Sequence, residues 1–196
     1  IHAYRITEFN FTHIMNQYHI KLGSKSPRRK QLLEGLGFPF EVIEIETDES
    51  FPDDLNLYQV PEFIAKNKFE EAKKLITQPD LLITADTTVI INNEILNKPQ
   101  NFEEAFEMLS KLSGQKHEVV TGVCIGTPDK QISFSDKTDV YFENLTPDEI
   151  KYYINTCKPY DKAGSYGIQE FIGYIGIKKI EGCFYNVMGL PIRKVY

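Results

Sequence analysis

The sequence predicts an α/β fold, because segments with the two-residue period of strands alternate with helical segments along most of the chain. Residues 58–76 place apolar side chains near helical spacing and charges on the other face, as in an amphipathic helix. Residues 81–85 are a compact apolar run, and residues 117–125 and 131–142 have the pattern of two long strands. A chain of 196 residues, 41% hydrophobic and 26% charged, is long enough for one domain of two lobes, or two small domains, with a proper core.

The composition restricts the class of partner. Lys and Arg total 22 against 28 Asp and Glu, whereas a dedicated nucleic-acid surface normally shows a basic excess, so we expect no strong nucleic-acid binding. Cys124, Cys157 and Cys183 lack C-x-x-C spacing, which indicates reduced thiols in a cytoplasmic protein and no zinc site. No apolar run approaches the ~18 residues of a membrane span and no secretory signal is visible, so we expect no membrane partner.

The N-terminal residues 1–14 show no clear period and precede Met15. We interpret them as an extension or a misplaced start, and expect a single domain over residues 15–196. The first regular pattern is a short strand at residues 19–22.

The helix that follows this strand begins with features of an anion site. Ser26 is a good N-cap and Pro27 suits the first helical position. Arg28 and Arg29 lie in the first turn, where the positive end of the helix makes each cation unfavourable by roughly 0.3–1 kcal/mol. Together with Ser24 they suit a phosphate, because hydroxyls, backbone N–H groups and guanidiniums all match its oxygens. The alternative is two solvated arginines on a surface helix.

Acidic residues follow two predicted strands. Residues 40–45 alternate like a half-buried strand and lead into a loop that holds Asp48 and Glu49, which without context are ordinary solvated turn residues. The run at residues 81–85 delivers Asp86 at its C-terminal end, where α/β sheets commonly present a catalytic or metal-binding carboxylate. The alternative is that Asp86 only caps a turn.

Two lysines, Lys68 and Lys98, lie in segments whose patterns assign them no role by themselves. Asn92 and Asn93 separate two apolar runs and predict a tight hairpin, with Lys98 at its return end. Lys68 lies in the amphipathic helix among charges that are mostly solvated, so its pattern alone assigns it no role.

The C-terminal half continues the alternation of elements. Residues 159–169 are mostly polar and contain proline, two glycines and charged residues within a short stretch. This density of turn-forming and charged residues is too high for a plain linker. A lone His117 at a strand start is more often structural than catalytic. The further elements that we expect are a helix over 102–112, a helix from Thr146 to Thr156, a strand within 173–180, and a turn at 185–191 into a last helix.

Six ordered motifs stand out over residues 20–191: S-x-S-P-R-R-x-x-L-L at 24–33, A-D-T at 85–87, K-P at 98–99, H-x-V-x-T-G-V at 117–123, D-K-A-G-x-Y-G-I-Q at 161–169 and N-V-x-G-L-P at 186–191. Together they resemble the Maf family of metal-dependent nucleoside triphosphate pyrophosphatases. The resemblance implies a fold related to inosine triphosphate pyrophosphatases: an elongated, mixed, twisted sheet, with helices around two lobes and a nucleotide cleft between them, often in a homodimer.

The resemblance also implies roles for the residues above. The acid of the A-D-T motif is the proton acceptor in the family, which matches Asp86. Substrate choice in the family is tied to positions that match Arg28, Thr87 and Gln169. Cleavage of the α–β phosphoanhydride needs neutralised phosphates and an in-line water. The groups that would contact the phosphates are Ser24, Arg28, Arg29, Lys68 and Lys98. Glu49 and Asp86 are the candidate ligands of Mg²⁺ or Mn²⁺, and Asp48 is the alternative to Glu49.

The motif D-K-A-G-x-Y-G-I-Q resembles the branch of the family that acts on pyrimidine triphosphates, which implies hydrolysis of dTTP and UTP to the monophosphate and pyrophosphate. Three other functions compete with this expectation. The first is the branch of the family that prefers 7-methyl-GTP, but this branch replaces the G-I-Q end of the loop. Gln169 has a carboxamide that donates and accepts at once, which suits the edge of uracil or thymine. The second is a house-cleaning pyrophosphatase of inosine-type nucleotides. The third is a DNA-binding or septum-regulating protein, which the acidic charge disfavours.

Overall fold

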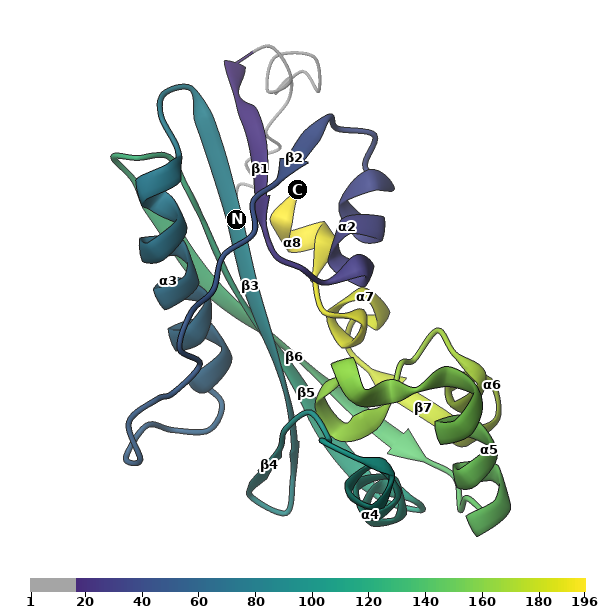
Figure 1. Cartoon of the computed structure of the whole chain (residues 1–196). Coiled ribbons are helices and arrows are strands. Elements are labelled where there is room, and N and C mark those ends of the chain that lie inside the picture. The colour runs from purple at the N-terminus through teal and green to yellow at the C-terminus, as the bar shows by residue number, and fades with distance from the viewer. Residues whose placement is uncertain (1–16) are drawn as a thin grey trace, which may run out of the picture.

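The computed structural model describes residues 17–196 (Figure 1), and the predicted extension at residues 1–14 lies outside them. The strands are β1 (His19–Gly23), β2 (Phe40–Val42), β3 (Asp80–Ile91), β4 (Glu94–Leu96), β5 (Lys116–Gly126), β6 (Gln131–Phe142) and β7 (Ile177–Glu181). The helices are α2 (Pro27–Glu34), α3 (Val60–Ala72), α4 (Phe102–Leu112), α5 (Pro147–Cys157), α6 (Phe171–Gly176), α7 (Phe184–Met188) and α8 (Ile192–Val195). None of the helices within residues 17–196 is long and apolar enough to cross a membrane.

The described strands form one mixed sheet of seven strands around the long strand β3. Their order is β2-β1-β3-β5-β6-β7, with β4 paired to β3 beside this path. β1 runs parallel to β2 and β3, and its pairing with β3 ends where Gly23 meets Thr84. Beyond that point β3 continues antiparallel to β5 and β4. The mixed α/β fold predicted from the sequence is therefore confirmed.

Helices cover the sheet in three groups, as Figure 1 shows. α3 lies along β3 and β5, and its Ala65, Phe69 and Ala72 pack on Leu82 and Cys124. The start of α3 approaches β5 closely: a Cβ on Gly122 would lie 2.2 Å from the backbone N of Glu62. α2, α7 and α8 gather near β1 and β2, whereas α4, α5 and α6 gather near β4 and β7. These two groups are the predicted lobes.

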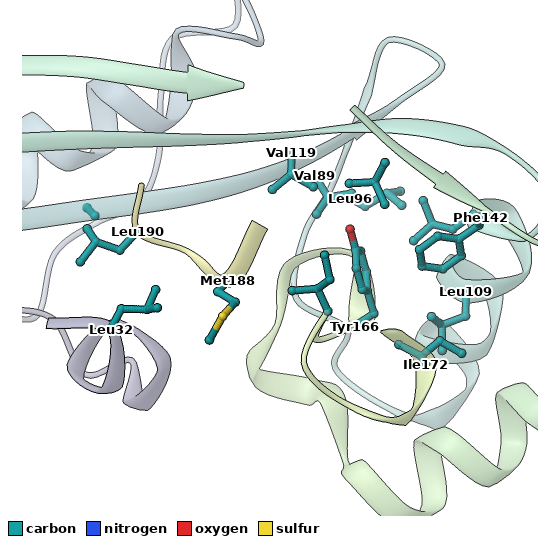
Figure 2. Packing of buried hydrophobic residues seen from close by; sticks show 14 of the residues in the cluster. Leu32, Val89, Leu96, Leu109, Val119, Phe142, Tyr166, Ile172, Met188 and Leu190 are labelled. Carbon is teal, nitrogen blue, oxygen red and sulfur yellow. The ribbon is translucent and has the colours of Figure 1, made fainter. Parts of the chain in front are cut away.

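One large apolar core joins the two lobes. Figure 2 shows Leu32 and Leu190 at one end of this core and Leu109, Phe142 and Ile172 at the other. Val89 and Val119, from the paired strands β3 and β5, lie between the two ends. Since burial of an aliphatic or aromatic side chain contributes about 1.5–3 kcal/mol, this core fixes the lobes on the sheet.

Most predicted elements are present with shifted ends. The hairpin is confirmed, since Asn92 and Asn93 both have positive φ (50° and 59°) and join β3 to β4. The helices capped by Asn101 and Thr146 are confirmed, the second with a capping box. The strand predicted at 40–45 is shorter, and the predicted strand within 173–180 is divided into the end of α6 and the start of β7.

Two interpretations of the sequence were wrong in position. Asp86 does not end a strand: β3 runs on to Ile91, because β5 and β4 provide pairing partners beyond the end of β1. The predicted turn at 185–191 contains α7 before α8 begins, and Gly189, at φ 113°, closes α7.

Candidate functional site

A cavity of about 430 Å³ lies between the two lobes over the middle of β3. The start of α2, residues 45–49, α3, the segment 161–169 and the end of α7 contribute to its lining. Each site residue predicted from the sequence lines it: Ser24, Arg28, Arg29, Glu49, Lys68, Asp86, Thr87, Lys98 and Gln169. Asp48 is not in this lining, and its carboxylate instead accepts hydrogen bonds from the backbone N and the hydroxyl of Ser50, at 2.9 and 2.7 Å.

Arg29 anchors the start of α2 through hydrogen bonds of its buried side chain. Its guanidinium is buried and donates to the carbonyl of Gly189 (2.8 Å), to Ser24 Oγ (3.2 Å) and to Thr87 Oγ1 (3.1 Å). Ser26 Oγ caps the helix by accepting from the backbone N–H of Arg29. Burial lowers the pKa of Arg29, and the charge of Asp86 opposes that shift. The part of the guanidinium fork that faces the cavity is therefore held in a fixed orientation.

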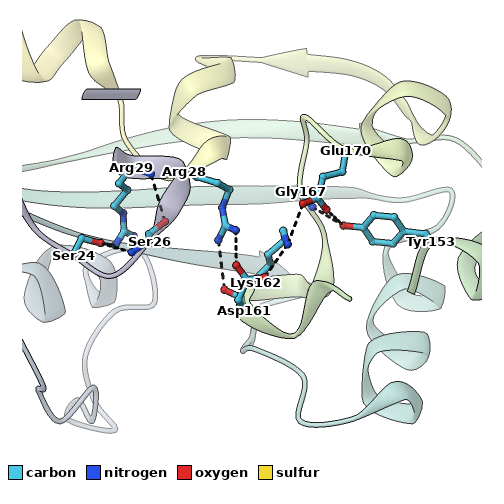
Figure 3. A network of polar contacts seen from close by, with 9 residues as sticks. All are labelled: Ser24, Ser26, Arg28, Arg29, Tyr153, Asp161, Lys162, Gly167 and Glu170. Atoms are coloured by element: carbon cyan, nitrogen blue, oxygen red, sulfur yellow. Dashed lines mark hydrogen bonds and ion pairs between the residues drawn. The ribbon is translucent and has the colours of Figure 1, made fainter. Parts of the chain in front are cut away.

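Arg28 projects from the same helix toward the other side of the cavity. Its Nη1 donates to Asp161 Oδ2 at 2.7 Å, and Asp161 Oδ1 also contacts Lys162 Nζ at 2.8 Å. Figure 3 shows this contact between α2 and the segment that holds Asp161. Partial burial acts to raise the pKa of Asp161, but its hydrogen bonds with Lys162 and Arg28 outweigh that effect and lower it. Asp161 is thus a carboxylate that two cations hold at the cleft.

Two carboxylates of the cavity share one ammonium group. Lys68 Nζ lies 2.7 Å from Asp86 Oδ1 and 2.7 Å from Glu49 Oε1, so these two oxygens can be no further apart than twice that distance. Lys98 Nζ lies 3.7 Å from the other oxygen of Glu49. Burial acts to raise the pKa of Glu49, but Lys68, Lys98 and Arg29 together lower it. Both acids are therefore available as hard oxygen donors.

A divalent cation suits this donor set. Mg²⁺ is commonly held by one or two carboxylates, with substrate phosphates and waters completing its coordination. Glu49 and Asp86 supply two such carboxylates at one place in the cavity, with Lys68 between them. Within residues 17–196 no group of three or more His, Cys, Asp or Glu side chains gathers as a metal site.

The predicted loop forms another part of the cavity lining. Gln169 lies there, and its Oε1 atom is buried with no hydrogen-bond partner among residues 17–196. Tyr166 also lines the cavity, and its hydroxyl is 2.7 Å from Nε2 of the buried His117. Burial lowers the pKa of His117 to about 3, so the ring is neutral and structural, in line with the interpretation of the sequence. The free carboxamide oxygen is thus a site for a ligand donor.

Several cavity residues had no individual role in the sequence analysis. Asp161 and Lys162 belong to the dense loop, but their partner Arg28 is 133 positions away from Asp161 along the chain. Thr87 was expected, but its hydrogen bond of 3.0 Å to Thr121 was not. The density of glycine and charge at 159–169 was the signal that this segment carries function; the pairings themselves leave no local pattern.

Comparisons with known proteins find relatives that match nearly the whole chain. The model of the family of Maf-like proteins matches residues 19–196. The dTTP/UTP pyrophosphatase of Parabacteroides distasonis is 51% identical over 183 residues, which are 93% of this chain and 95% of that protein. The dTTP/UTP pyrophosphatase of Bacteroides thetaiotaomicron is 48% identical over the same shares of the two chains. Among solved structures, the Ham1 protein of Staphylococcus aureus aligns with a TM-score of 0.44 at 17% identity, over 80% of this chain and 90% of that chain.

Proposed function

The chain belongs to the Maf family, and from this premise we propose that it is a nucleoside triphosphate pyrophosphatase that hydrolyses dTTP and UTP to the monophosphate and pyrophosphate. The observation that carries the proposal is the convergence of phosphate-binding cations and paired carboxylates on one cavity between the lobes. Relatives that carry this activity in their names cover nearly the whole chain.

The triphosphate would occupy the end of the cavity near α2. Arg28 and Lys98 both line the cavity and would supply positive charge to the phosphates, and Ser24 adds a hydroxyl beside the helix start. Negative charge grows on the bridging oxygen as the α–β bond breaks, and preorganised cations stabilise it with little reorganisation. Arg29 contributes by holding Ser24 and Thr87 in place through its buried hydrogen bonds.

Asp86 would accept the proton of the attacking water. It is a partly buried carboxylate on β3, where its backbone pairs with Gly122 of β5, so its position is fixed before the substrate binds. Glu49 and Asp86 would hold the Mg²⁺ or Mn²⁺, which would neutralise phosphate charge and favour attack by water. Lys68 Nζ contacts both acids, so it would have to shift from between them toward the phosphates when the cation binds.

The preference for a pyrimidine is supported by two side chains in the loop. The buried, unpartnered Oε1 of Gln169 can accept from the N–H of uracil or thymine, while the amide N–H₂ donates to the adjacent carbonyl. Glu170 is the acid that could have favoured the cationic base of 7-methyl-GTP. Its carboxylate instead contacts Lys162 Nζ at 3.0 Å and the Tyr153 hydroxyl, so it is occupied within the protein.

The test is a panel of dTTP, UTP, CTP, inosine triphosphate and 7-methyl-GTP with Mg²⁺ or Mn²⁺, scored for pyrophosphate against phosphate release. We expect pyrophosphate from dTTP and UTP, and the highest kcat/KM for these two. Release of orthophosphate with a nucleoside diphosphate would refute the reaction type. A higher kcat/KM for 7-methyl-GTP, or an unchanged ranking of bases in Gln169→Glu, would refute the base preference.

The cell location and assembly complete the proposal. A cytoplasmic location is supported by the nucleotide substrate and by the free thiols of Cys124, Cys157 and Cys183. Homodimer formation stays a prediction from the family resemblance, and light scattering of the purified protein would test it.

A further inference from the structure

A single buried hydroxyl holds both ends of the turn that carries Gln169. Tyr153 on α5 is fully buried, and its hydroxyl accepts from the backbone N–H of Gly167 at 3.0 Å and donates to the carboxylate of Glu170. The backbone N–H of Glu170 also donates to the carbonyl of Gly167 at 3.0 Å. Gln169 therefore lies inside a tight turn whose first and last residues are attached to one atom.

We call the contacts of the Tyr153 hydroxyl with Gly167 and Glu170 the Tyr153 clamp. The Glu170 carboxylate in this clamp also has a charged partner. Glu170 Oε1 lies 3.0 Å from Lys162 Nζ, and Lys162 is itself buried and also paired with Asp161. Figure 3 shows the continuous series of contacts from Tyr153 through Glu170 and Lys162 to Asp161 and Arg28. Lys162 is buried and Glu170 is only partly exposed, and loss of one partner would leave the charge of the other without its partner, so Glu170 has little freedom to turn away.

Space around the turn is equally restricted. A Cβ on Gly167 would lie 2.8 Å from the carboxyl carbon of Glu170, so this glycine allows the acid to fold back over the turn. Burial and the neighbouring Glu170 raise the pKa of Tyr153, which keeps its hydroxyl protonated and able to donate. Neither Tyr153 nor Glu170 is among the residues that line the cavity of about 430 Å³.

We propose that Tyr153 and Glu170 are positioning residues for base recognition, because they fix the backbone of Gln169 at the distance where its carboxamide meets the pyrimidine edge. This inference rests on the proposed function. A site that hydrogen-bonds one edge of a base rejects another base only if its own groups stay in place, since the rejection comes from groups left unpaired. Loss of the clamp should therefore reduce selectivity between bases and leave the phosphate contacts as they are.

The test compares Tyr153→Phe with Tyr152→Phe, each removing one hydroxyl from neighbouring positions of α5. Tyr152 is 56% exposed and packs its ring on Phe171, so it serves as the matched control. The readout is the ratio of kcat/KM for UTP to that for CTP, which share sugar and phosphates and differ at the base edge. We expect the ratio to fall about tenfold in Tyr153→Phe, through kcat/KM for UTP, and to stay unchanged in Tyr152→Phe.

A double-mutant cycle separates positioning from general destabilisation. In a Gln169→Ala background the clamp has no carboxamide to place, so we expect Tyr153→Phe to change the ratio no further. If thermal unfolding shows that Tyr153→Phe does not fold, Glu170→Gln replaces it in the cycle. This variant retains the shape of the side chain and loses the charge that pairs with Lys162, and we expect its ratio to fall as well.

The outcomes distinguish this inference from the proposed function. A parent protein that releases no pyrophosphate from UTP overturns both. A selective parent whose clamp variant is equally selective overturns the inference alone. Equal losses for UTP and CTP, or a full effect of the clamp variant in the Gln169→Ala background, also overturn it, because they would show a purely structural role.

Discussion

Replacing Arg28 by alanine should slow pyrophosphate release far more than replacing Lys30, although the two residues are only two positions apart on α2. The Arg28 side chain is 18% exposed and lines the cavity. The Lys30 side chain is 55% exposed and lies 3.8 Å from Glu34 on the same helix. The two variants thus remove one positive charge each from the same helix, one inside the site and one outside it.

The expected loss of kcat is larger by orders of magnitude in Arg28→Ala than in Lys30→Ala. Loss of a preorganised electrostatic contact typically costs about 2.7–4 kcal/mol of transition-state stabilisation, which is about 100- to 1,000-fold in kcat. The free energy of unfolding should change little in Arg28→Ala. Loss of the pair with the half-exposed Asp161 costs at most about 1 kcal/mol, and removal of a cation from the positive end of α2 returns about 0.3–1 kcal/mol. Lys30→Ala loses only a surface pair worth about 0.3–0.5 kcal/mol.

The assay couples pyrophosphate release from UTP to an inorganic pyrophosphatase and reads phosphate, with the melting temperature of each variant measured beside it. Arg28→Lys is the graded variant, because it keeps the charge and loses the planar fork; we expect it to fall between the parent and Arg28→Ala. Equal and small effects of Arg28→Ala and Lys30→Ala would refute the reasoning. The arginines would then be ordinary solvated side chains of a surface helix.

Three further predictions follow from the carboxylates of the cavity. Asp86→Asn should lower kcat more than tenfold with an unchanged melting temperature; activity above about a tenth of the parent, a barrier change under ~1.4 kcal/mol, would make the residue structural. Glu49→Gln should raise the Mg²⁺ concentration needed for half-maximal rate, whereas Asp48→Asn should not, since Asp48 does not line the cavity and its carboxylate is hydrogen-bonded to Ser50; the reverse order would exchange their roles. The pKa of Asp161 is lower in the folded protein than its ordinary value, so its stabilising contribution is present above about pH 4 and is lost as the pH falls through the folded pKa. In Asp161→Asn, the melting temperature should fall less steeply as the pH is lowered below about 4 than it does in the parent protein. An unchanged dependence of the melting temperature on pH would contradict this.

Local sequence chemistry was sufficient for most elements of the fold. Asn101 and Thr146 start helices because their side chains accept from backbone N–H groups that the helix leaves free. Asn92 and Asn93 form the hairpin because both tolerate positive φ. Such features depend on residues within one turn of each other, which is the range that a pattern reveals.

The extent of β3 could not be predicted in this way. The apolar run before Asp86 is interrupted by polar residues, which resembles a strand end, yet β3 continues through them. The reason is tertiary: β5 pairs with β3 well past Asp86, and part-buried hydrogen bonds such as that of Thr87 with Thr121 satisfy the polar side chains. Strand length is decided by the partner strand more than by the strand itself.

In the candidate site too, local features could be predicted from the sequence and contacts between distant elements could not. Motifs identified which residues gather in the cavity, because each motif is contiguous. The contacts between motifs, such as Arg28 with Asp161 or Lys68 with Asp86 and Glu49, depend on the packing of distant elements. The Tyr153 clamp was missed for a further reason, since a buried tyrosine on an amphipathic helix has the pattern of an ordinary core residue.

The uninterrupted course of β3 also limits how the protein can move. Asp86 and Thr87 lie in the middle of a strand that pairs with β5 from Leu82 to Ile90, while its other edge pairs with β1 before them and with β4 after them. A hinge between the two lobes at this point would have to break the pairing of β3 with β5. Opening of the cleft must then come from its rim, from the start of α2 and the segment 161–169, while the chemical centre stays still. In amide hydrogen exchange, β3 should be the slowest segment with or without nucleotide, and the change on nucleotide binding should be confined to the rim.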